Sequence, residues 1–527
     1  MSIKSRSSGV LMPVSALPGD YGIGTLGQEA RSFIDRLQAM GFSYWQILPA
    51  SPVDACFSPY KSTSAFAGNF YLIDLELLSS WGLLTTDELT AYQSADPPYS
   101  INYPNLIHNR DTVFKLAYSR LSTQLKKAIQ DYCDANNDWL PDFSLYTVLS
   151  QHFSEENWSK WSDQDLVKRC PETLALVQHS YREEIDFQNF LQYAYDQQWS
   201  ALKSYANTRG IEIIGDMPIY VAHTSADVWC HPELFLLDEA GCPIEVAGVP
   251  PDYFCEDGQL WGNPLYRWDV MKNNQYGWWM RRIEKALASF DLVRIDHFRG
   301  FSAYWSVPVS EETARNGRWI PGPAMDFFSQ LKKSFPNPGI IAEDLGLQDH
   351  ELVKLLADTG FPGMRIMEFA FIDEVNNIHL PHNYTPNTVA YSGTHDNNTL
   401  LGTFFDYSPE HRDYAFEYCG YADRWENQWQ IGGHQSSSCR AFIRTLFQSA
   451  ANLVILPIQD LCGYGSDTRM NKPGTTKNNW VFRMTREGLA AIDVDWYDHL
   501  NQLYHRKHKL TVTLSSDYGL SDQKPNS

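Results

Sequence analysis

Eight short, largely apolar runs are the feature that most restricts how this chain can fold. They cover residues 9–14, 42–49, 211–219, 292–300, 339–345, 364–369, 389–396 and 452–457. Between the first two runs, apolar side chains in residues 28–40 recur with the 3.6-residue period of a helix, and Gly41 suits the end of that helix. Strand, helix and strand at this spacing predict a parallel βαβ unit, and therefore an α/β fold.

Residues 292–300 carry the first candidates for chemistry. Side chains alternate between the two faces of an extended strand, so Arg294 and Asp296 point the same way. A neighbouring guanidinium keeps a carboxylate ionised. An ionised carboxylate that is held in place is what a covalent attack on a sugar carbon requires. A purely structural Arg–Asp pair at a strand end is the alternative interpretation of the same two residues.

Two further runs also contain carboxylates at their ends. Glu343 and Asp344 are adjacent, so only one of them can enter a site at the end of an extended strand. A partly buried glutamate near another carboxylate acquires the raised pKa of an acid catalyst. Asp396 supplies a third acid. These acids and His395 could instead bind a divalent ion, but no H-E-x-x-H or comparable ligand spacing is present, and we expect no metal.

The connecting segments supply the other candidate groups. Residues 57–69 have no period, and Tyr60 in this loop can either stack on a sugar or simply pack. Asp216, near the end of the third run, can bond a sugar hydroxyl or cap a loop. Residues 247–264, rich in proline, glycine and aromatic side chains, predict an active-site loop insertion. Residues from about 76 to 210 predict a helical insertion between the second and third strands.

Composition argues against several classes of function. At 527 residues, with 43% hydrophobic side chains, the chain can bury a large core. A net charge of −21 argues against nucleic acid and anionic membranes as partners, whereas a neutral substrate is indifferent to it. The nine cysteines form no C-x-x-C pair, which favours a reducing compartment. With no signal-peptide pattern and no long apolar run, we expect a cytoplasmic protein, with a plastid as the alternative.

Residues 22–27 match the G-x-G-x-x-G pattern of dinucleotide-binding proteins. A long loop with a proline separates this pattern from the preceding strand, and no acidic residue closes the next strand about 20 residues later. We therefore interpret the pattern as a glycine-rich turn.

Ten motifs occur in one order along nearly the whole chain. They are residues 17–24, 45–49, 58–60, 64–69, 215–221, 260–264, 294–300, 342–346, 393–399 and 469–475. They include Arg294-Ile295-Asp296-His297-Phe298-Arg299-Gly300, Ala342-Glu343-Asp344-Leu345-Gly346 and Gly393-Thr394-His395-Asp396-Asn397-Asn398-Thr399. In these motifs the chain resembles the 4-α-glucanotransferases, also called amylomaltases or disproportionating enzymes, of glycoside hydrolase family 77.

By this resemblance residues 1–527 are one catalytic (β/α)8 TIM barrel with largely helical insertions and no cofactor. Asp296 is implied as the nucleophile, Glu343 as the acid/base and Asp396 as the stabiliser of the transition state. The implied substrate-binding residues are Arg294, His395, Tyr60, Asp216, Trp261 and Asn263. The implied reaction is the transfer of α-1,4-glucan segments between malto-oligosaccharides through a covalent glucosyl-Asp intermediate.

Two short segments depart from the family pattern. Residues 53–57 stand where the family has a glycine-rich turn ending in aspartate, and residues 461–465 differ from the usual run after Gln459-Asp460. Both departures concern outer subsites. Two other functions stay open at this point: an amylase-type hydrolase of α-1,4-glucans with the same three acids, and a non-catalytic glucan-binding protein.

Overall fold

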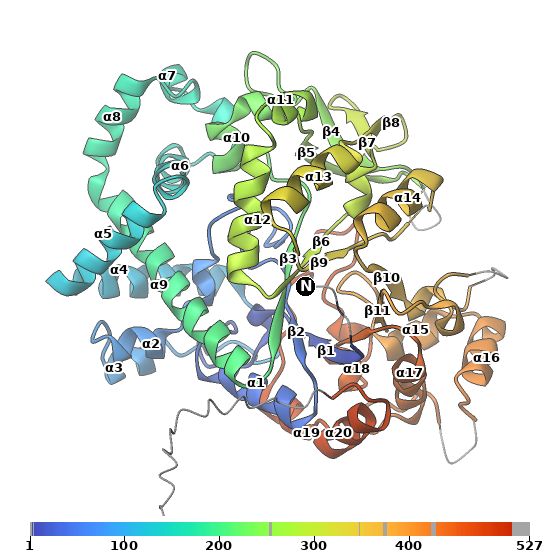
Figure 1. Ribbon diagram of the computed structural model, residues 1–527. Coiled ribbons are helices and arrows are strands. Elements are labelled where there is room, and N and C mark those ends of the chain that lie inside the picture. The colour runs from blue at the N-terminus through green and yellow to red at the C-terminus, as the bar shows by residue number, and fades with distance from the viewer. Residues whose placement is uncertain are drawn as a thin grey trace, which may run out of the picture.

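The computed structural model describes Ile3 and residues 5–251, 256–346, 348–372, 377–422 and 428–507. Eight parallel strands form a barrel in the middle of the molecule (Figure 1). They are β1 (Ser7–Leu11), β2 (Tyr44–Gln46), β3 (Glu212–Met217), β6 (Leu292–Ile295), β9 (Ile340–Ala342), β10 (Gly363–Ile366), β11 (Thr388–Tyr391) and β12 (Leu453–Pro457). Each of the eight predicted runs thus overlaps one barrel strand.

Neighbouring barrel strands pair in the order β10-β11-β12-β1-β2-β3-β6-β9, which follows the chain around the barrel. Every one of these pairings is parallel. Between β9 and β10 the amide of Ala342 donates to the carbonyl of Pro362 at 2.9 Å, and the amide of Met364 donates to the Asp344 carboxylate at 2.6 Å. These two bonds join the remaining edges, so the predicted (β/α)8 barrel is confirmed.

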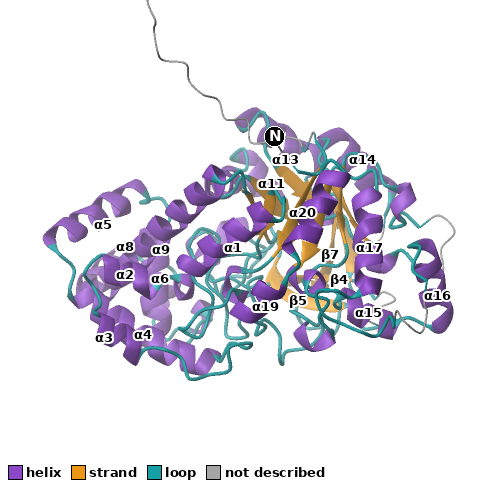
Figure 2. Ribbon diagram, turned by 90° about the horizontal axis from the view of Figure 1, so that it is seen from below, coloured by secondary structure: helices purple, strands orange, loops and turns teal. Residues whose placement is uncertain are grey.

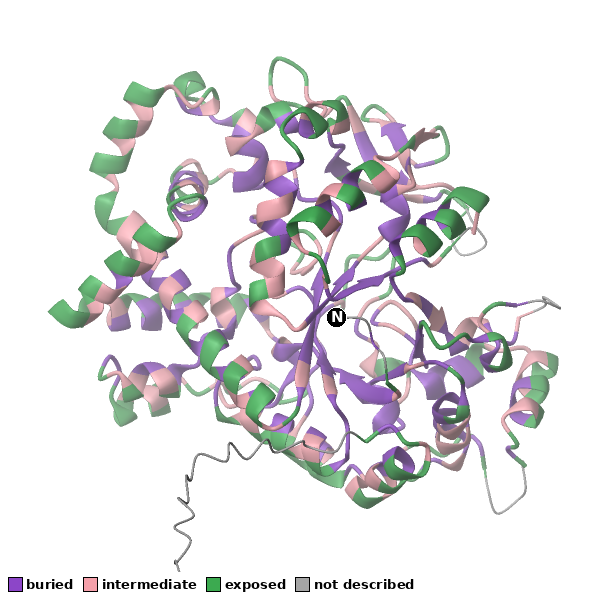
Figure 3. Ribbon diagram, in the orientation of Figure 1, coloured by how far each residue is buried: buried purple, intermediate pink, exposed green. Residues whose placement is uncertain are grey.

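The barrel strands are buried on both faces, which explains why the sequence shows them as continuous apolar runs. Every residue of β1, β6, β11 and β12 is buried. In Figure 3 the buried residues gather on the central strands, and exposed residues lie on the outward sides of the surrounding helices. Removal of this apolar surface from water is the main stabilising contribution to such a core.

Helices surround the barrel (Figures 1 and 2). The predicted first helix is α1 (Gln28–Ala39), and Gly41 follows it with a φ of 77°, a left-handed conformation that glycine adopts without strain. The others are α10 (Ala226–Cys230), α11 (Trp268–Asn273), α12 (Gly277–Ser289), α13 (Ala324–Ser334), α14 (His350–Thr359), α15 (Leu400–Asp406), α16 (Pro409–Tyr418), α17 (Ser437–Gln448), α18 (Ile458–Leu461), α19 (Arg486–Ala491) and α20 (Val494–Leu503). None of the described helices is long and apolar enough to cross a membrane.

The chain between β2 and β3 forms a helical lobe on one side of the barrel (Figures 1 and 2). Its helices are α2 (Leu75–Ser80), α3 (Thr86–Ala91), α4 (Tyr103–Ser119), α5 (Thr123–Ala135), α6 (Leu140–Phe153), α7 (Gln164–Val167), α8 (Pro171–Ser180) and α9 (Arg182–Thr208). On α9 the amide of Gln192 exchanges two hydrogen bonds with the backbone of Gly68, at 2.8 and 2.9 Å. Gln198 bonds the backbone of Asp74 in the same way. The helix therefore anchors the loop that follows β2.

A second, antiparallel sheet has the strand order β5-β4-β7-β8. Its strands are β4 (Glu245–Val249), β5 (Gln259–Pro264), β7 (Ala303–Pro308) and β8 (Arg318–Pro321). Residues 247–264 are predicted as a loop, yet the segment begins and ends as strands, and residues 252–255 lie outside the described residues. The prediction is wrong for β4 and β5, which pair with each other as an antiparallel hairpin. The other neighbour of β4 is the distant β7, with Ala247 opposite Ser306, and a local pattern cannot show that partner.

Several predicted runs extend past the ends of the strands. β10 stops at Ile366, and the remainder of that run is the 3-10 helix Met367–Phe369. β11 stops at Tyr391, so Asp396 lies beyond it in a loop. The candidate acids consequently sit past the carboxyl ends of the strands, where sites of barrel enzymes lie.

Candidate active site

Arg294, on β6, is at the centre of the candidate site. Its guanidinium donates to both carboxylate oxygens of Asp216 at 2.7 Å and to Oδ1 of Asp296 at 2.9 Å. The predicted proximity of Arg294 and Asp296 is therefore confirmed. The Asp216 side chain is fully buried, whereas the Asp296 side chain is 27% exposed. Asp296 is held through one oxygen, and its Oδ2 makes no hydrogen bond to any described residue.

Tyr60 reaches this cluster from the loop after β2. Its hydroxyl donates to Asp216 at 2.7 Å and lies 3.3 Å from Nδ1 of His395. The rings of Tyr60 and His395 stack with centroids 4.8 Å apart. Burial and the negative charge of Asp216 raise the pKa of Tyr60 well above its ordinary value, so the hydroxyl keeps its proton. Tyr60 therefore joins the loop after β2 to β3 and to the loop after β11.

Glu343 and Asp344 face different surroundings, as expected for adjacent residues of an extended chain. Asp344 is fully buried beside β10, where it accepts a hydrogen bond from the amide of Met364 and pairs with Arg365 at 2.9 Å. Asp344 therefore has a structural role in closing the barrel, and Glu343 is the residue left for the site.

The carboxyl group of Glu343 is held by two backbone amides. His297 donates to Oε2 at 2.7 Å, and Leu345 donates to Oε1 at 2.8 Å. Burial, together with the negative charge of Asp296, raises the pKa of Glu343 to about 8, against the opposing effect of Arg294. At neutral pH Glu343 is therefore mostly protonated, which is the form an acid catalyst needs.

The amide of His297 reaches Glu343 because the chain turns sharply after Asp296. His297 has a φ of 50°, a left-handed conformation that is strained in a residue other than glycine. Burial lowers the pKa of His297 to about 4, so its ring is neutral. Trp261 packs edge-on against this ring with centroids 4.8 Å apart. The strained turn thus connects the Asp296 strand end, Glu343 and the β5 hairpin.

Asp396 is fixed by a clamp between two loops. Its Oδ1 accepts from the side-chain NH2 group of Asn471 at 2.6 Å and lies 3.3 Å from Nε2 of His395. Arg469 donates to the backbone carbonyls of Asp396 and Asn471, at 2.5 and 2.7 Å. The Asp396 side chain is 47% exposed. Oδ2 of Asp396 makes no hydrogen bond within the described chain, so it is available to a ligand.

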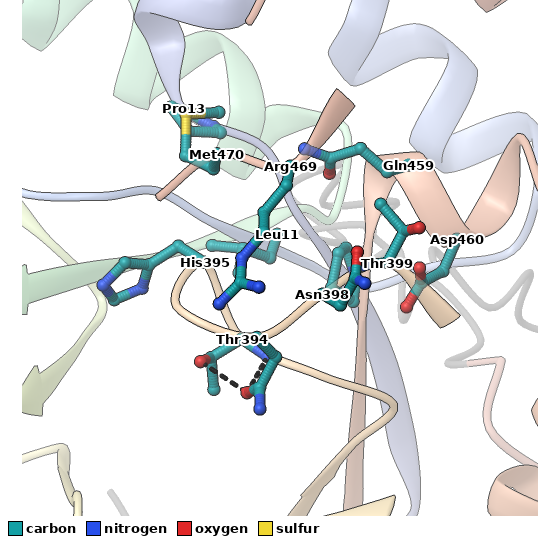
Figure 4. A pocket seen from close by; sticks show the side chains of 12 residues that line it. Leu11, Pro13, Thr394, His395, Asn398, Thr399, Gln459, Asp460, Arg469 and Met470 are labelled. Carbon is teal, nitrogen blue, oxygen red and sulfur yellow. Dashed lines mark hydrogen bonds between the residues drawn. The ribbon is translucent and has the colours of Figure 1, made fainter. Parts of the chain in front are cut away.

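A small cavity of about 20 Å³, large enough for one water, is lined by residues on both sides of Asp396 and by the segments that follow β1 and β12 (Figure 4). Arg469, His395 and Asp460 are among the residues that line it. Asp460 accepts from Ser392 Oγ at 2.5 Å and from the amide of Leu400 at 2.8 Å. The loop after β11 is therefore fixed at both ends.

The candidate site opens into a cavity of about 330 Å³. Six predicted residues line it: Tyr60, Trp261, Asn263, Asp296, His395 and Asp396. The other three, Arg294, Asp216 and Glu343, are buried. Arg294 bonds Asp296 and Asp216 bonds Tyr60, both of which line the cavity. Glu343 accepts from the backbone amide of His297, the residue after Asp296, and its pKa responds to the charge of Asp296. The structure therefore brings all nine predicted site residues together.

Two details of this cavity were not predicted from the sequence. Asn471 lines the cavity and bonds Asp396, although it follows no strand end; its motif, 469–475, is the only available signal. Asn263, predicted to bind sugar, donates its amide to the carbonyl of Val221 at 2.9 Å and is 7% exposed. This bond links β5 to the loop that follows β3, so Asn263 has a structural role in addition to any contact with substrate.

The structure bears on two alternative interpretations of the sequence, a metal site and a dinucleotide-binding turn. In the described ranges, no group of three or more His, Cys, Asp or Glu side chains is placed to hold a metal ion. In the G-x-G-x-x-G pattern, a Cβ at Gly24 would come within 2.0 Å of the Val14 carbonyl, so this glycine is required for close backbone packing.

Comparison with known proteins identifies the family. The sequence model described as 4-alpha-glucanotransferase matches residues 12–489. A 4-alpha-glucanotransferase of Clostridium butyricum is 41% identical over 474 residues, which are 90% of this chain and 95% of that protein. One from Streptococcus pneumoniae is 39% identical over 514 residues, 97% of this chain and 100% of that protein.

A solved structure agrees with these matches. The amylomaltase from Streptococcus agalactiae in complex with acarbose is 39% identical and superposes with a TM-score of 0.91, covering 95% of this chain and 100% of that chain. Both the fold and the sequence are thus similar over almost the full length, and this chain belongs to the 4-alpha-glucanotransferase family, glycoside hydrolase family 77.

Proposed function

We propose that this protein transfers α-1,4-glucan segments between malto-oligosaccharides by a retaining double displacement. The observation that carries the proposal is a pair of unlike carboxyl groups: Asp296 is hydrogen-bonded to Arg294 and open on one oxygen, whereas Glu343 is buried and its pKa is raised to about 8. Retaining glycosidases use such a pair as nucleophile and acid. The names of the relatives, and the acarbose bound to the Streptococcus agalactiae amylomaltase, support the class of substrate.

In the first step, Oδ2 of Asp296 attacks the anomeric carbon of a donor glucan. The bond from that carbon to the glycosidic oxygen breaks as Glu343 transfers its proton to the leaving oxygen. The products are a glucosyl ester of Asp296, a shortened glucan that leaves with a free 4-hydroxyl, and an ionised Glu343. Arg294 stays bound to Asp216 and orients Asp296 for the attack.

In the second step, the 4-hydroxyl of an acceptor glucan attacks the same carbon. Its proton passes to Glu343, the ester bond to Asp296 breaks, and both catalytic groups return to their starting forms. Asp396 accepts hydrogen bonds from sugar hydroxyls through its free Oδ2, and such bonds strengthen as the ring distorts toward the transition state. His395 and Asn471 hold the other oxygen of Asp396.

Transfer requires that the glucosyl ester reacts with an acceptor sugar faster than it reacts with water. Trp261 and residues of the segment from Asn471 to Trp480 line the cavity. We assign to them the role of covering the bound acceptor. An acceptor that stacks on Trp261 is held in attack geometry, and positioning can supply effective concentrations far above those in bulk solution. The same ring excludes water from the ester.

With maltotriose as the only substrate, we expect glucose and a ladder of longer glucans at a nearly constant number of reducing ends. Transfer exchanges one α-1,4 bond for another, whereas hydrolysis adds one reducing end per event. Chromatography of the products together with a reducing-end assay measures both quantities. A steady rise in reducing ends without any product longer than maltotriose would favour the amylase-type hydrolase instead.

Replacing Trp261 with alanine is expected to lower the rate of transfer roughly tenfold, since loss of the ring removes acceptor stacking. Hydrolysis should fall less, because water gains access to the ester. The ratio of new reducing ends to transferred glucosyl units measures the shift. Trp261→Phe keeps a ring face and should stay close to the wild type; an unchanged ratio in Trp261→Ala would remove Trp261 from the acceptor site.

The pH dependence of kcat/KM should follow the protonated fraction of Glu343. Its pKa of about 8 means that the protonated acid predominates below pH 8 and is lost as the pH rises through that value. We expect kcat/KM for maltotriose to fall about tenfold per pH unit above pH 8. A donor with a fluoride leaving group needs no proton, so it should lack this alkaline limb; the same limb with both donors would contradict the assignment.

A further inference from the structure

A second crevice lies between the helical lobe and the barrel, behind the wall of the active-site cavity. It has a volume of about 90 Å³ and is bordered by α5, α9 and α12 and by the loops that follow β2 and β3. Tyr60, Pro218 and Tyr220 line both this crevice and the active-site cavity. The volume is enough for roughly six waters, about the space that one hexose ring with its hydroxyls displaces.

The crevice has hydrogen-bonding groups without protein partners. Tyr132 and Tyr195 line it, and neither hydroxyl makes a hydrogen bond to any part of the chain that the structure describes. Burial raises the pKa of both phenols, so each hydroxyl keeps its proton and can both donate and accept. Partnerless hydroxyls in a partly buried space favour an occupant that carries hydroxyl groups.

The charges around the crevice are balanced. Lys285 lies 3.5 Å from Asp196 across the opening, with both side chains about one-third exposed. Arg282 donates to the carbonyls of Ile219 and Pro218, at 3.1 and 2.5 Å, and so supports the shared wall. Asp216 is neutralised by Arg294. The charge of Arg282 is opposed by the buried Asp227, with which it interacts electrostatically, so the charges around the crevice favour a neutral ligand.

Aromatic rings provide the apolar surfaces. The rings of Phe66 and Trp139 stack with centroids 6.3 Å apart and planes 18° apart, and Lys285 lies over Trp139 at 5.7 Å. Trp199 borders the crevice on the α9 side. Flat aromatic surfaces beside hydroxyl groups match a pyranose ring, which has apolar faces and a hydroxylated edge.

We propose that this crevice is a second, non-catalytic binding site for one neutral hexose. Glucose is the natural candidate, and this choice rests on the proposed function, because glucose is the small product expected from maltotriose. Since Tyr60 and Tyr220 belong to both spaces, an occupant contacts the wall of the active site without entering it.

The test uses the full-length Asp296→Asn protein, in which no turnover is expected, with maltotetraose present at saturation to fill the active site. Glucose is then titrated and its contact with the protein is followed by saturation-transfer NMR. We expect a saturable signal at millimolar glucose. A much weaker signal is expected with sorbitol, which has the hydroxyls but no ring; equal signals, or none with glucose, would overturn the proposal.

Matched variants in the same background locate the signal. Ala286→Trp on α12 should fill the crevice and weaken glucose binding at least tenfold, whereas Ala288→Trp, at an exposed position of the same helix, should leave it unchanged. Tyr195→Phe removes only a hydroxyl and should weaken binding three- to tenfold, which keeps the test valid if Ala286→Trp does not fold. Undiminished binding in folded Ala286→Trp or in Tyr195→Phe would place glucose elsewhere.

The glucose site and the proposed transferase function can be tested independently. In the Asp296-containing protein, Ala286→Trp should retain kcat and KM for maltotriose within twofold in the absence of added glucose. If the wild-type protein fails to form longer glucans from maltotriose, the transferase proposal is wrong, while glucose binding to the crevice is still measured independently. If transfer proceeds and the crevice gives no signal, only the second site is lost.

Discussion

Asp296→Asn is expected to lower transfer from maltotriose by roughly four orders of magnitude or more, because an amide cannot replace the carboxylate as nucleophile. Arg294 keeps its two bonds to Asp216 in this variant, and the asparagine oxygen can still accept from Arg294, so the barrel should remain folded. The measurements are the rate at which longer glucans appear and the melting temperature of the variant.

Asp269→Asn provides a matched control for this change. The Asp269 side chain on α11 is 75% exposed, and the same substitution there should leave both the rate and the melting temperature unchanged. Residual activity of Asp296→Asn above about 1% of the wild type, in a preparation free of deamidated protein, would assign the nucleophile to another carboxylate.

Glu343→Gln is expected to lower kcat/KM for maltotriose by roughly three orders of magnitude, the range in which a general acid contributes. The effect on a maltosyl fluoride donor should be much smaller for the first step, since fluoride leaves without a proton. The second step still lacks its base, so the maltosyl ester of Asp296 should accumulate with this donor. A rapid-quench experiment with intact-protein mass spectrometry measures the burst of fluoride and the trapped ester.

Stability has to be measured beside activity in this variant. The carboxyl group of Glu343 accepts from the amides of His297 and Leu345, and the NH2 group of glutamine must face one of these donors. Glu351→Gln, at a side chain that is 76% exposed on α14, serves as the control. Equal losses with maltotriose and with the fluoride donor, in folded protein, would show that Glu343 is not the acid.

The strands of the barrel were predictable from the sequence because they are local features, whereas their closure into a (β/α)8 barrel was implied by the family resemblance. A strand buried on both faces appears as an apolar run whatever its neighbours are, and α1 appears through its own period. The antiparallel sheet was not predictable in this way. β4 pairs with the adjacent β5, but its other partner, β7, follows only after β5, α11, α12 and β6, so that second pairing depends on the folded barrel and not on a pattern of adjacent residues.

The candidate site, like the fold, was predictable only where it depends on local sequence. By itself, the sequence determined where acids follow apolar runs, that Arg294 and Asp296 share a face, and that Glu343 and Asp344 cannot, because these properties depend on spacing along a single strand. Only the tertiary structure decided which groups those acids meet.

Arg294 bonds Asp216 from another strand, and Asn471 bonds Asp396 from a loop far along the chain. The pKa of Glu343 is likewise a property of the folded protein, since it depends on burial and on the charge of Asp296. Electrostatic energies depend on distance in space and on exclusion of water, and neither quantity exists for these residues until the barrel has closed.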